Sequence, residues 1–242
     1  MAKDWFTWKG EKSTVYGIRV LQQPPIVLPM ERVKYETVTG RAGSLAMVEG
    51  SYIYDDVQLP FECIMDNLEQ LKAAAAWLQG SGRLEYPGRP GGWYNARIAQ
   101  QISMEKILAA REHRQFTLTF RADPFFYLSS AQDLTTTAAS FGIDNPGTVP
   151  SEPRITIYGS GSVGLTLGGQ LVTLHGLDGG IILDTELQDA LSLDGAELLN
   201  DKMTGDFMTI PTGHSTLEWF EDETSTGGSV TRIDIMPRWR CL

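Results

Sequence analysis

Residues 159–164 (GSGSVG) have the glycine spacing of a phosphate-binding loop and are the first candidate for chemistry. A phosphate loop leads into a helix, usually through a Lys-Ser or Lys-Thr pair, and the helix amides bind the phosphate. Neither feature follows here, because Leu165, Thr166 and Leu167 alternate in polarity as a strand does. We therefore predict a hairpin turn at residues 159–164.

Five carboxylates between residues 178 and 194 suggest a second kind of chemistry, as an acid–base pair for sugar hydrolysis or as calcium ligands. They are Asp178, Asp184, Glu186, Asp189 and Asp194. Their spacing lacks the Asp-x-Asp-x-Asp-Gly loop that a glutamate closes, so solvated turn residues are the favoured interpretation.

Nucleophiles are also poorly placed for catalysis. No Gly-x-Ser-x-Gly elbow leads into a helix, and neither Cys63 nor Cys241 has a histidine at a useful spacing. The histidines, His113, His175 and His214, lie far apart and form no zinc-binding pattern. We therefore predict a protein that is not an enzyme, that holds no cofactor and no metal, and whose two cysteines form no disulfide.

Aromatic and arginine side chains point to a protein interface instead, because tryptophan, tyrosine and arginine contribute most of the energy of protein contacts. One group follows a glycine-rich turn, a second lies at residues 49–54, and a third is close to the carboxy terminus. The candidates are Trp93, Tyr94, Arg97, Glu49, Tyr52, Tyr54, Arg238, Trp239 and Arg240. Packing in a core is the alternative for each tryptophan.

One stretch has the spacing of a helix. Asp66 is placed to cap its first turn, and Glu69 to reach back to the cap. Apolar residues that recur at helical spacing are expected to press on a sheet, and they are Leu68, Leu71, Ala75 and Leu78. Gly80 and Gly82 end the helix. Trp77 lies at the margin of the apolar stripe and is left open between core and surface.

The segment before this helix predicts an extended strap and a hairpin. Pro24, Pro25 and Pro29 lack amide donors, so residues 22–30 are expected outside the interior of a sheet. Residues 32–38 and 51–55 have strand character and flank a glycine-rich loop. The hairpin is either internal to its domain or an arm that reaches a neighbouring subunit.

The remaining residues predict a mainly β protein of two domains. Residues 104–112 are good helix formers, yet we favour a strand there. After the turn signal at residues 144–147, short apolar runs alternate with glycine breaks, as in an antiparallel sandwich or barrel. We place the domains at residues 1–145 and 146–242.

Charge is unevenly distributed between these halves. Residues 1–145 hold 15 Lys and Arg against 16 Asp and Glu, whereas residues 146–242 hold 5 against 14. Such acidity opposes binding to phosphate backbones, so we predict no specific recognition of nucleic acid. The sequence has no apolar stretch of membrane-spanning length and no apolar run near its start, which predicts production in the cytoplasm and no membrane contact.

An ordered set of motifs resembles the distal tail (Dit) family of long-tailed bacteriophages. The set comprises residues 76–84 (AWLQGSGRL), 93–98 (WYNARI), 116–120 (FTLTF) and 124–127 (PFFY). Residues 145–148, 153–157 and 235–240 are similar to the family's second module. The resemblance therefore extends over nearly the whole chain and is weakest between Gly40 and Pro60.

The resemblance implies a fold and a structural role. It implies a β-sandwich-like ring domain with one α-helix and a hairpin arm, followed by a galectin-like β-sandwich. In such proteins six copies form a ring that joins the tail tube protein to the tail tip or baseplate hub protein, and DNA passes through it. A receptor-binding protein is a further candidate partner. The location would be the virion, with assembly in the host cytoplasm. The alternative is a carbohydrate-binding sandwich in which Trp219 or Trp239 stacks on a sugar.

Overall fold

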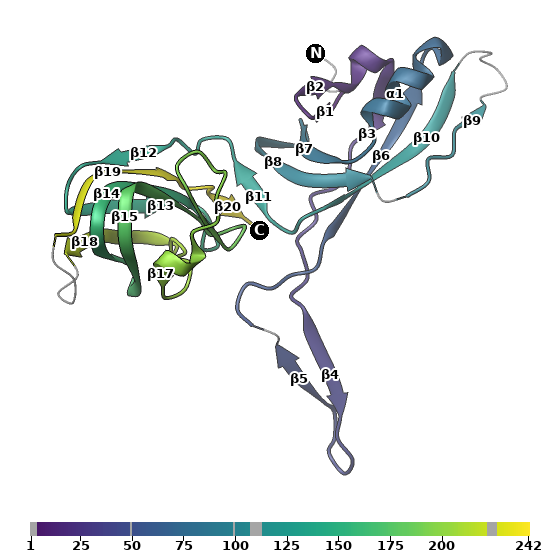
Figure 1. Ribbon diagram of the computed structural model, residues 1–242. Helices are drawn as coiled ribbons and strands as arrows, with labels where there is room; N and C mark the ends of the chain where they lie inside the picture. Colours follow the sequence, from purple (N-terminus) through teal and green to yellow (C-terminus); the bar gives the residue numbers. More distant parts are fainter. Residues whose placement is uncertain (1–3, 49, 99, 107–112, 222–226) are drawn as a thin grey trace. The chain divides into compact units, whose positions relative to one another are not determined.

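The computed structural model describes residues 4–48, 50–98, 100–106, 113–221 and 227–242, and it is mainly β, as predicted (Figure 1). The chain divides into two compact units, Met1–Ser129 with Leu242 and Ser130–Cys241. Strands β12 (Leu134–Thr136) and β13 (Ser140–Asn145) belong to the second unit. The unit boundary therefore precedes the one we placed after residue 145.

The first unit is built on an antiparallel sheet with the strand order β2-β1-β7-β8-β10-β6-β3. Its strands are β1 (Thr7–Trp8), β2 (Glu11–Lys12), β3 (Ile18–Gln22), β6 (Val57–Met65), β7 (Ser81–Tyr86), β8 (Arg89–Ile98) and β10 (Arg114–Ala122). The short strands β9 (Glu105–Lys106) and β11 (Phe126–Leu128) pair with β10 and β8, respectively. Strand β6 buries every second residue, so one face of the sheet supplies the core.

Aromatic rings fill this core. Phe6 lies 5.2 Å from Phe61 and 5.4 Å from Phe120, measured between ring centroids. Trp8 and Trp77 each donate an indole N–H to the other's carbonyl oxygen, at 3.2 Å in both directions. The reciprocal bonds satisfy two buried donors and tie the helix to the sheet, so Trp77 is a core residue.

The helix differs from the prediction in its cap and in its buried face. It consists of a 3₁₀ turn, η2 (Leu68–Gln70), and α1 (Leu71–Trp77), the single α-helix of the described residues. Asn67, not Asp66, caps it, by accepting a hydrogen bond from the Glu69 amide at 2.8 Å. Asp66 is instead paired with Arg19 of β3. The prediction of Asp66 as the cap was therefore wrong.

The buried stripe of α1 is also displaced from the predicted one. Ala74, Trp77 and Leu78 face the core, whereas Leu68 and Leu71 are each 37% exposed. A large indole in the interior rotates the helix toward itself, because it removes more apolar area from water than a leucine does. The predicted stripe was therefore only partly correct, and two leucines remain on the surface.

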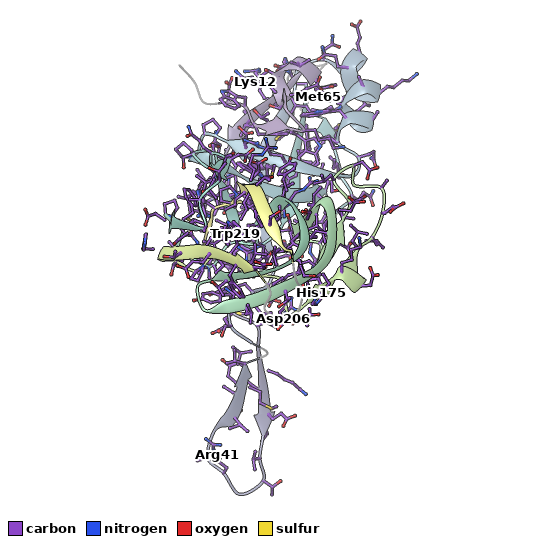
Figure 2. The ribbon with its side chains drawn as sticks, turned by 60° about the vertical axis from the view of Figure 1, so that its left-hand side comes forward. Lys12, Arg41, Met65, His175, Asp206 and Trp219 are labelled. Carbon is purple, nitrogen blue, oxygen red and sulfur yellow. The ribbon has the colours of Figure 1, made fainter. Side chains whose placement is uncertain are left out.

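Strands β4 (Val33–Thr37) and β5 (Ser44–Val48) form a separate two-stranded sheet (Figure 1). The first strand matches the prediction. The second lies inside the segment that we expected to be loop, whereas the predicted partner strand at residues 51–55 is limited to one bridge between Glu31 and Tyr54. The side chains of this hairpin, including Arg41 in its turn, stand apart from the densely packed ones (Figure 2).

The second unit is a β structure centred on two long strands, β14 (Arg154–Leu167) and β15 (Gln170–Asp184). The strand order is β12-β19-β14-β15-β16, with β18 pairing both β13 and β14, and β17 pairing β15. The remaining bounds are β16 (Asp189–Leu191), β17 (Met203–Thr204), β18 (Gly213–Glu221), β19 (Ser229–Met236) and β20 (Arg240–Cys241). Short 3₁₀ turns are η1 (Ser13–Tyr16) in the first unit and η3 (Asn200–Lys202) in the second.

The glycine-rich stretch 159–164 lies within β14 and forms no turn. The register between β14 and β15 shifts between Gly161 and Val163, which marks a β-bulge. Gly161 has φ +76°, and a Cβ there would lie 2.3 Å from the carbonyl oxygen of Gly227. The chain reverses later, at Gly168 and Gly169. The predicted hairpin turn at 159–164 was wrong. The stretch continues as strand to Leu167, whereas a phosphate loop would lead into a helix.

Helix-forming composition at residues 104–112 is overridden where the structure describes it. Glu105 and Lys106 pair with β10 as a strand, while strand β8 already ends at Ile98. Residues 107–112 lie outside the described part of the chain. The choice of strand over helix is therefore confirmed at residues 105 and 106 only.

Candidate functional site

The β4–β5 hairpin and the strap before it carry a concentration of exposed apolar side chains. Tyr35 is 69% exposed, and every residue of β5 is exposed. In the strap, Leu28 and Met30 are each 72% exposed. Exposed apolar surface of this extent marks a contact site in soluble proteins. We call residues 33–48 the arm.

The two faces of the arm differ in charge. Residues that pair directly across a hairpin project from the same face, and the register aligns Val33 with Val48 and Tyr35 with Ala46. That face is uncharged, and it ends with Thr37 opposite Ser44. The other face carries Lys34 and Glu36, whose charged groups lie 3.4 Å apart. An apolar contact would therefore use the uncharged face.

The base of the arm is held by backbone and side-chain bonds. The Asp55 amide donates to the Met30 carbonyl at 2.9 Å, and the Arg32 amide donates to the Ile53 carbonyl at 3.0 Å. The Arg32 guanidinium also binds the Asp55 carboxylate at 3.0 Å. These bonds hold together the two segments that connect the arm to the rest of the first unit.

Two predicted interface residues, Tyr52 and Tyr54, lie next to this base. Tyr54 is half-buried, with its ring edge-on to Phe125 at 5.9 Å. Tyr52 is 46% exposed and has φ +62°, so it lies in a turn. Glu49 lies outside the described residues. Tyr35 and the strand β5 were not singled out from the sequence, although Leu45, Ala46, Met47 and Val48 form a short apolar run that is compatible with a strand. An interface role for any of these residues stays a prediction.

The predicted group at residues 93–97 is arranged as a stack. The guanidinium of Arg83 lies 3.7 Å from the centroid of the half-buried Trp93 ring, which stacks on Tyr127 at 5.7 Å. Tyr94 is buried, and its hydroxyl oxygen accepts a hydrogen bond from Arg89. Arg97 is exposed. The structure places Tyr94 in an intramolecular contact, while Arg97 and an edge of Trp93 face solvent.

The group at residues 238–240 holds the end of the chain to the second unit. Arg238, with φ +51°, binds both carboxylate oxygens of Asp184 at 2.7 and 2.9 Å. Arg240 binds both carboxylate oxygens of Glu152 at 2.8 and 2.9 Å. Trp239, which stands between these two arginines in the sequence, is buried. These contacts account for the charge-aromatic-charge pattern within one chain, and an interface role stays a prediction.

Asp184 is almost completely buried and yet charged. Burial alone would raise the pKa of Asp184, but the hydrogen bonds and the positive charge of Arg238 hold that pKa below its usual value. Among the carboxylates singled out from the sequence, Asp184 therefore has a structural partner. Within the described ranges, no three His, Cys, Asp or Glu side chains are grouped so that they could hold a metal ion.

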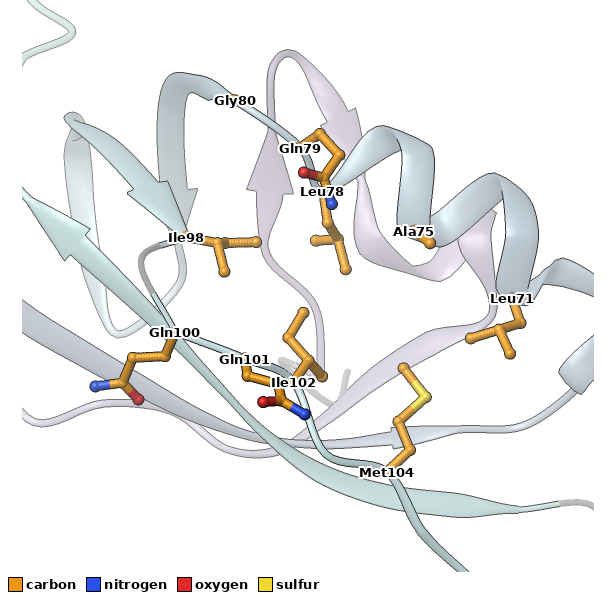
Figure 3. A pocket seen from close by; sticks show the side chains of 10 residues that line it. All are labelled: Leu71, Ala75, Leu78, Gln79, Gly80, Ile98, Gln100, Gln101, Ile102 and Met104. Atoms are coloured by element: carbon orange, nitrogen blue, oxygen red, sulfur yellow. The ribbon is translucent and has the colours of Figure 1, made fainter.

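A cavity lies beside α1. It measures about 500 Å³ and is lined by ten residues, none of them charged (Figure 3). Without a nucleophile, an acid–base pair or a metal ligand set in its lining, the cavity offers apolar contact and amide hydrogen bonds. No helix in the part of the chain that the structure covers is both long and apolar enough to cross a membrane.

No protein-family model and no curated protein sequence matches the chain. Among solved structures, the chain is similar to the crystal structure of the SPP1 Dit protein, described as a paradigm of the hub adsorption apparatus in phages that infect Gram-positive bacteria. The TM-score is 0.71 at 15% sequence identity, over 96% of this chain and 97% of that chain. The likeness covers both units.

The chain thus has the fold of a Dit protein. The resemblance predicted from the motifs at residues 76–127 is confirmed at the level of the fold, and so is the mainly β fold class. The galectin-like character of the second unit, the ring and its partners stay predictions.

Proposed function

We propose that the chain is a structural protein of a phage tail, a hub at its distal end. Copies associate into a ring, six in number by the resemblance, that joins the tail tube protein to the tip or baseplate hub protein. The observation that carries the proposal is the Dit fold over 96% of the chain. The location is then the virion, after assembly in the host cytoplasm, and the role is structural with no catalytic step.

The arm supplies one half of a ring contact. A closed ring requires two different patches on each copy, so that the front of one meets the back of the next. The arm is apolar, exposed and paired with no other strand among the described residues. The first unit as a whole suits such contacts, because its near-zero net charge avoids repulsion between copies, whereas the second unit is strongly acidic.

The ring also sets a condition on its inner wall. DNA that passes through a tail must not be held by rows of lysine and arginine, since each neutralised phosphate strengthens binding. In the first unit Asp55 is paired with Arg32, and Asp56 with Arg121. Each of these pairs offsets one positive charge. We expect the purified ring to bind duplex DNA weakly.

The test is the mass of the full chain in solution, compared with a variant in which residues 38–43 are replaced by a two-residue Asn-Gly turn and strands β4 and β5 are shortened. We expect the full chain to form rings in negative-stain images and the variant to be monomeric, with the melting temperature that the full chain has when it is diluted to the monomer. A full chain that stays monomeric at all accessible concentrations would overturn the ring. A lower melting temperature than that of the full-chain monomer would mean that the hairpin is internal.

A carbohydrate-binding role for the second unit is the alternative. Trp239 is buried, so of the two tryptophans considered only the half-buried Trp219 has ring surface left for a sugar. A glycan array with the full chain separates the two functions, because a hub without a sugar site gives no signal.

A further inference from the structure

The groove beside α1 is a second apolar surface that the described residues of the first unit leave uncovered. Leu71 and Leu78, from α1 and its end, point toward Ile98, Ile102 and Met104 from the opposite side (Figure 3). Leu71 is 37% exposed, although it belongs to the helix stripe that the sequence marks as apolar. The groove exists because Trp77 takes the core-facing position and leaves Leu71 outside.

We infer that this groove receives the arm of the neighbouring copy, an assignment that rests on the proposed ring. The inference names the second of the two patches that a closed ring requires. Arm and groove lie in the same unit but at different elements, so one copy can offer its arm while it receives another.

Charge is the first argument for this pairing. None of the ten residues that line the groove is charged, and its polar side chains, Gln79, Gln100 and Gln101, are neutral amides. The arm face with Val33, Tyr35, Ala46 and Val48 is likewise uncharged. Burying a charged residue in such a groove would be costly, so the groove selects an uncharged partner.

Size is the second argument. A cavity of about 500 Å³ has the volume of a small-ligand site, enough for a few side chains. The uncharged arm face presents one tyrosine flanked by smaller residues, Val48 and Ala46. A tyrosine is a favourable anchor, since its ring is apolar and its hydroxyl can bond the amides at the rim. Tyr35 is the residue that we assign to the centre of the groove.

The first test uses matched charge substitutions in the full chain, with association followed by sedimentation. Ala75→Glu places a charge in the groove, whereas Ala76→Glu places it on the exposed side of the same helix. On the arm, Tyr35→Lys alters the uncharged face and Met47→Lys the opposite face. We expect Ala75→Glu and Tyr35→Lys to weaken association at least about a hundredfold, and the two controls to change it less than about threefold.

The second test does not depend on the stability of α1. Chains with Tyr35→Cys are mixed with chains carrying Ala75→Cys, both in a Cys241→Ser background, and oxidised; the native Cys63 is buried. We expect a disulfide-linked dimer only in the mixture, and none when Ala76→Cys replaces Ala75→Cys.

The outcomes separate the inference from the proposed function. One outcome is that shortening the arm abolishes association, Ala75→Glu preserves it and the cysteine pair fails to link. The ring would then stand, and the groove would not be the surface that receives the arm. If the full chain is monomeric in every assay, both the ring and the binding of the arm in the groove are overturned.

Discussion

The β4–β5 and β14–β15 hairpins have the same antiparallel pairing and opposite surroundings. Most residues of strand β14 are buried, whereas every residue of β5 is exposed. An isolated two-stranded hairpin is marginally stable in water, because it has no third element on which to bury its apolar face. The difference therefore teaches that the long hairpin builds the second unit, while the arm has no third strand of the described residues beside it.

Truncation of a core side chain in β14 should show the contrast between the two hairpins most strongly. Leu165 of β14 is fully buried. We expect Leu165→Ala to lower the free energy of unfolding by about 2–5 kcal/mol, because it removes buried methyl groups and leaves a cavity. Leu171→Ala, in a side chain that is 55% exposed on the partner strand, is the matched control. Urea titration measures both, and equal losses would contradict the assignment of the core.

Removing Arg238 should have the next largest effect. Its partner Asp184 has a side chain only 3% exposed, so Arg238→Met leaves a buried carboxylate without its main counter-charge. We expect a loss of about 3 kcal/mol at neutral pH. Arg32→Met at the base of the arm is the control, since that ion pair is half exposed and should contribute little.

The effect of Arg238→Met should depend on pH in a defined direction. Because Arg238 lowers the pKa of Asp184 in the folded protein, the pair stabilises it above the unfolded pKa of about 4, and this stability is lost as pH falls through the folded pKa. The deficit of the variant should therefore be largest near pH 7 and shrink below pH 4. A deficit that is independent of pH would assign the loss to packing alone.

Two glycines with similar φ values, one in β14 and one in the arm, extend the comparison of the two hairpins. Gly161 has φ +76° and lies against Gly227, whereas a Cβ added to Gly43 in the arm, at φ +78°, would meet no atom of the described residues within 4 Å. Gly161→Ala should cost about 1–3 kcal/mol of unfolding free energy. Gly43→Ala should strain only the turn of the arm. Thermal melts of the two variants measure the difference, and a larger shift for Gly43→Ala would reverse the conclusion.

The smallest effect on stability is expected in the arm itself. Leu45 is 38% exposed, so Leu45→Ala should change the free energy of unfolding by less than about 0.5 kcal/mol. Chemical denaturation of the monomer at low concentration provides the measurement. A loss comparable to that of Leu165→Ala would show that the arm packs on its own chain.

Local patterns predicted much of this architecture. The single helix, the strap at residues 22–30 and the first arm strand followed from spacing, proline chemistry and alternation, which act within a few residues. What failed depended on distant partners. Asp66 did not cap the helix because Arg19, 47 residues away, binds it, and the helix stripe rotated because Trp77 meets Trp8 across the sheet.

The site was harder to predict than the fold for a related reason. An exposed apolar strand such as β5 looks like loop when its segment contains three glycines, because pattern analysis expects apolar residues to be buried. Conversely, Arg238 and Arg240 have the residue types of an interface but find carboxylates within their own unit. Residue type alone does not tell a partner in the same chain from one outside it.

The arm has a further consequence for the chain before assembly. Each strand of a two-stranded sheet is an edge, with a row of N–H and C=O groups open to any other extended chain. On β4, Lys34 and Glu36 obstruct such pairing, but β5 reads Ser44-Leu45-Ala46-Met47-Val48 without a charge. The protein therefore carries an aggregation-prone edge, and its tendency to aggregate should rise with concentration wherever this edge of β5 is left uncovered.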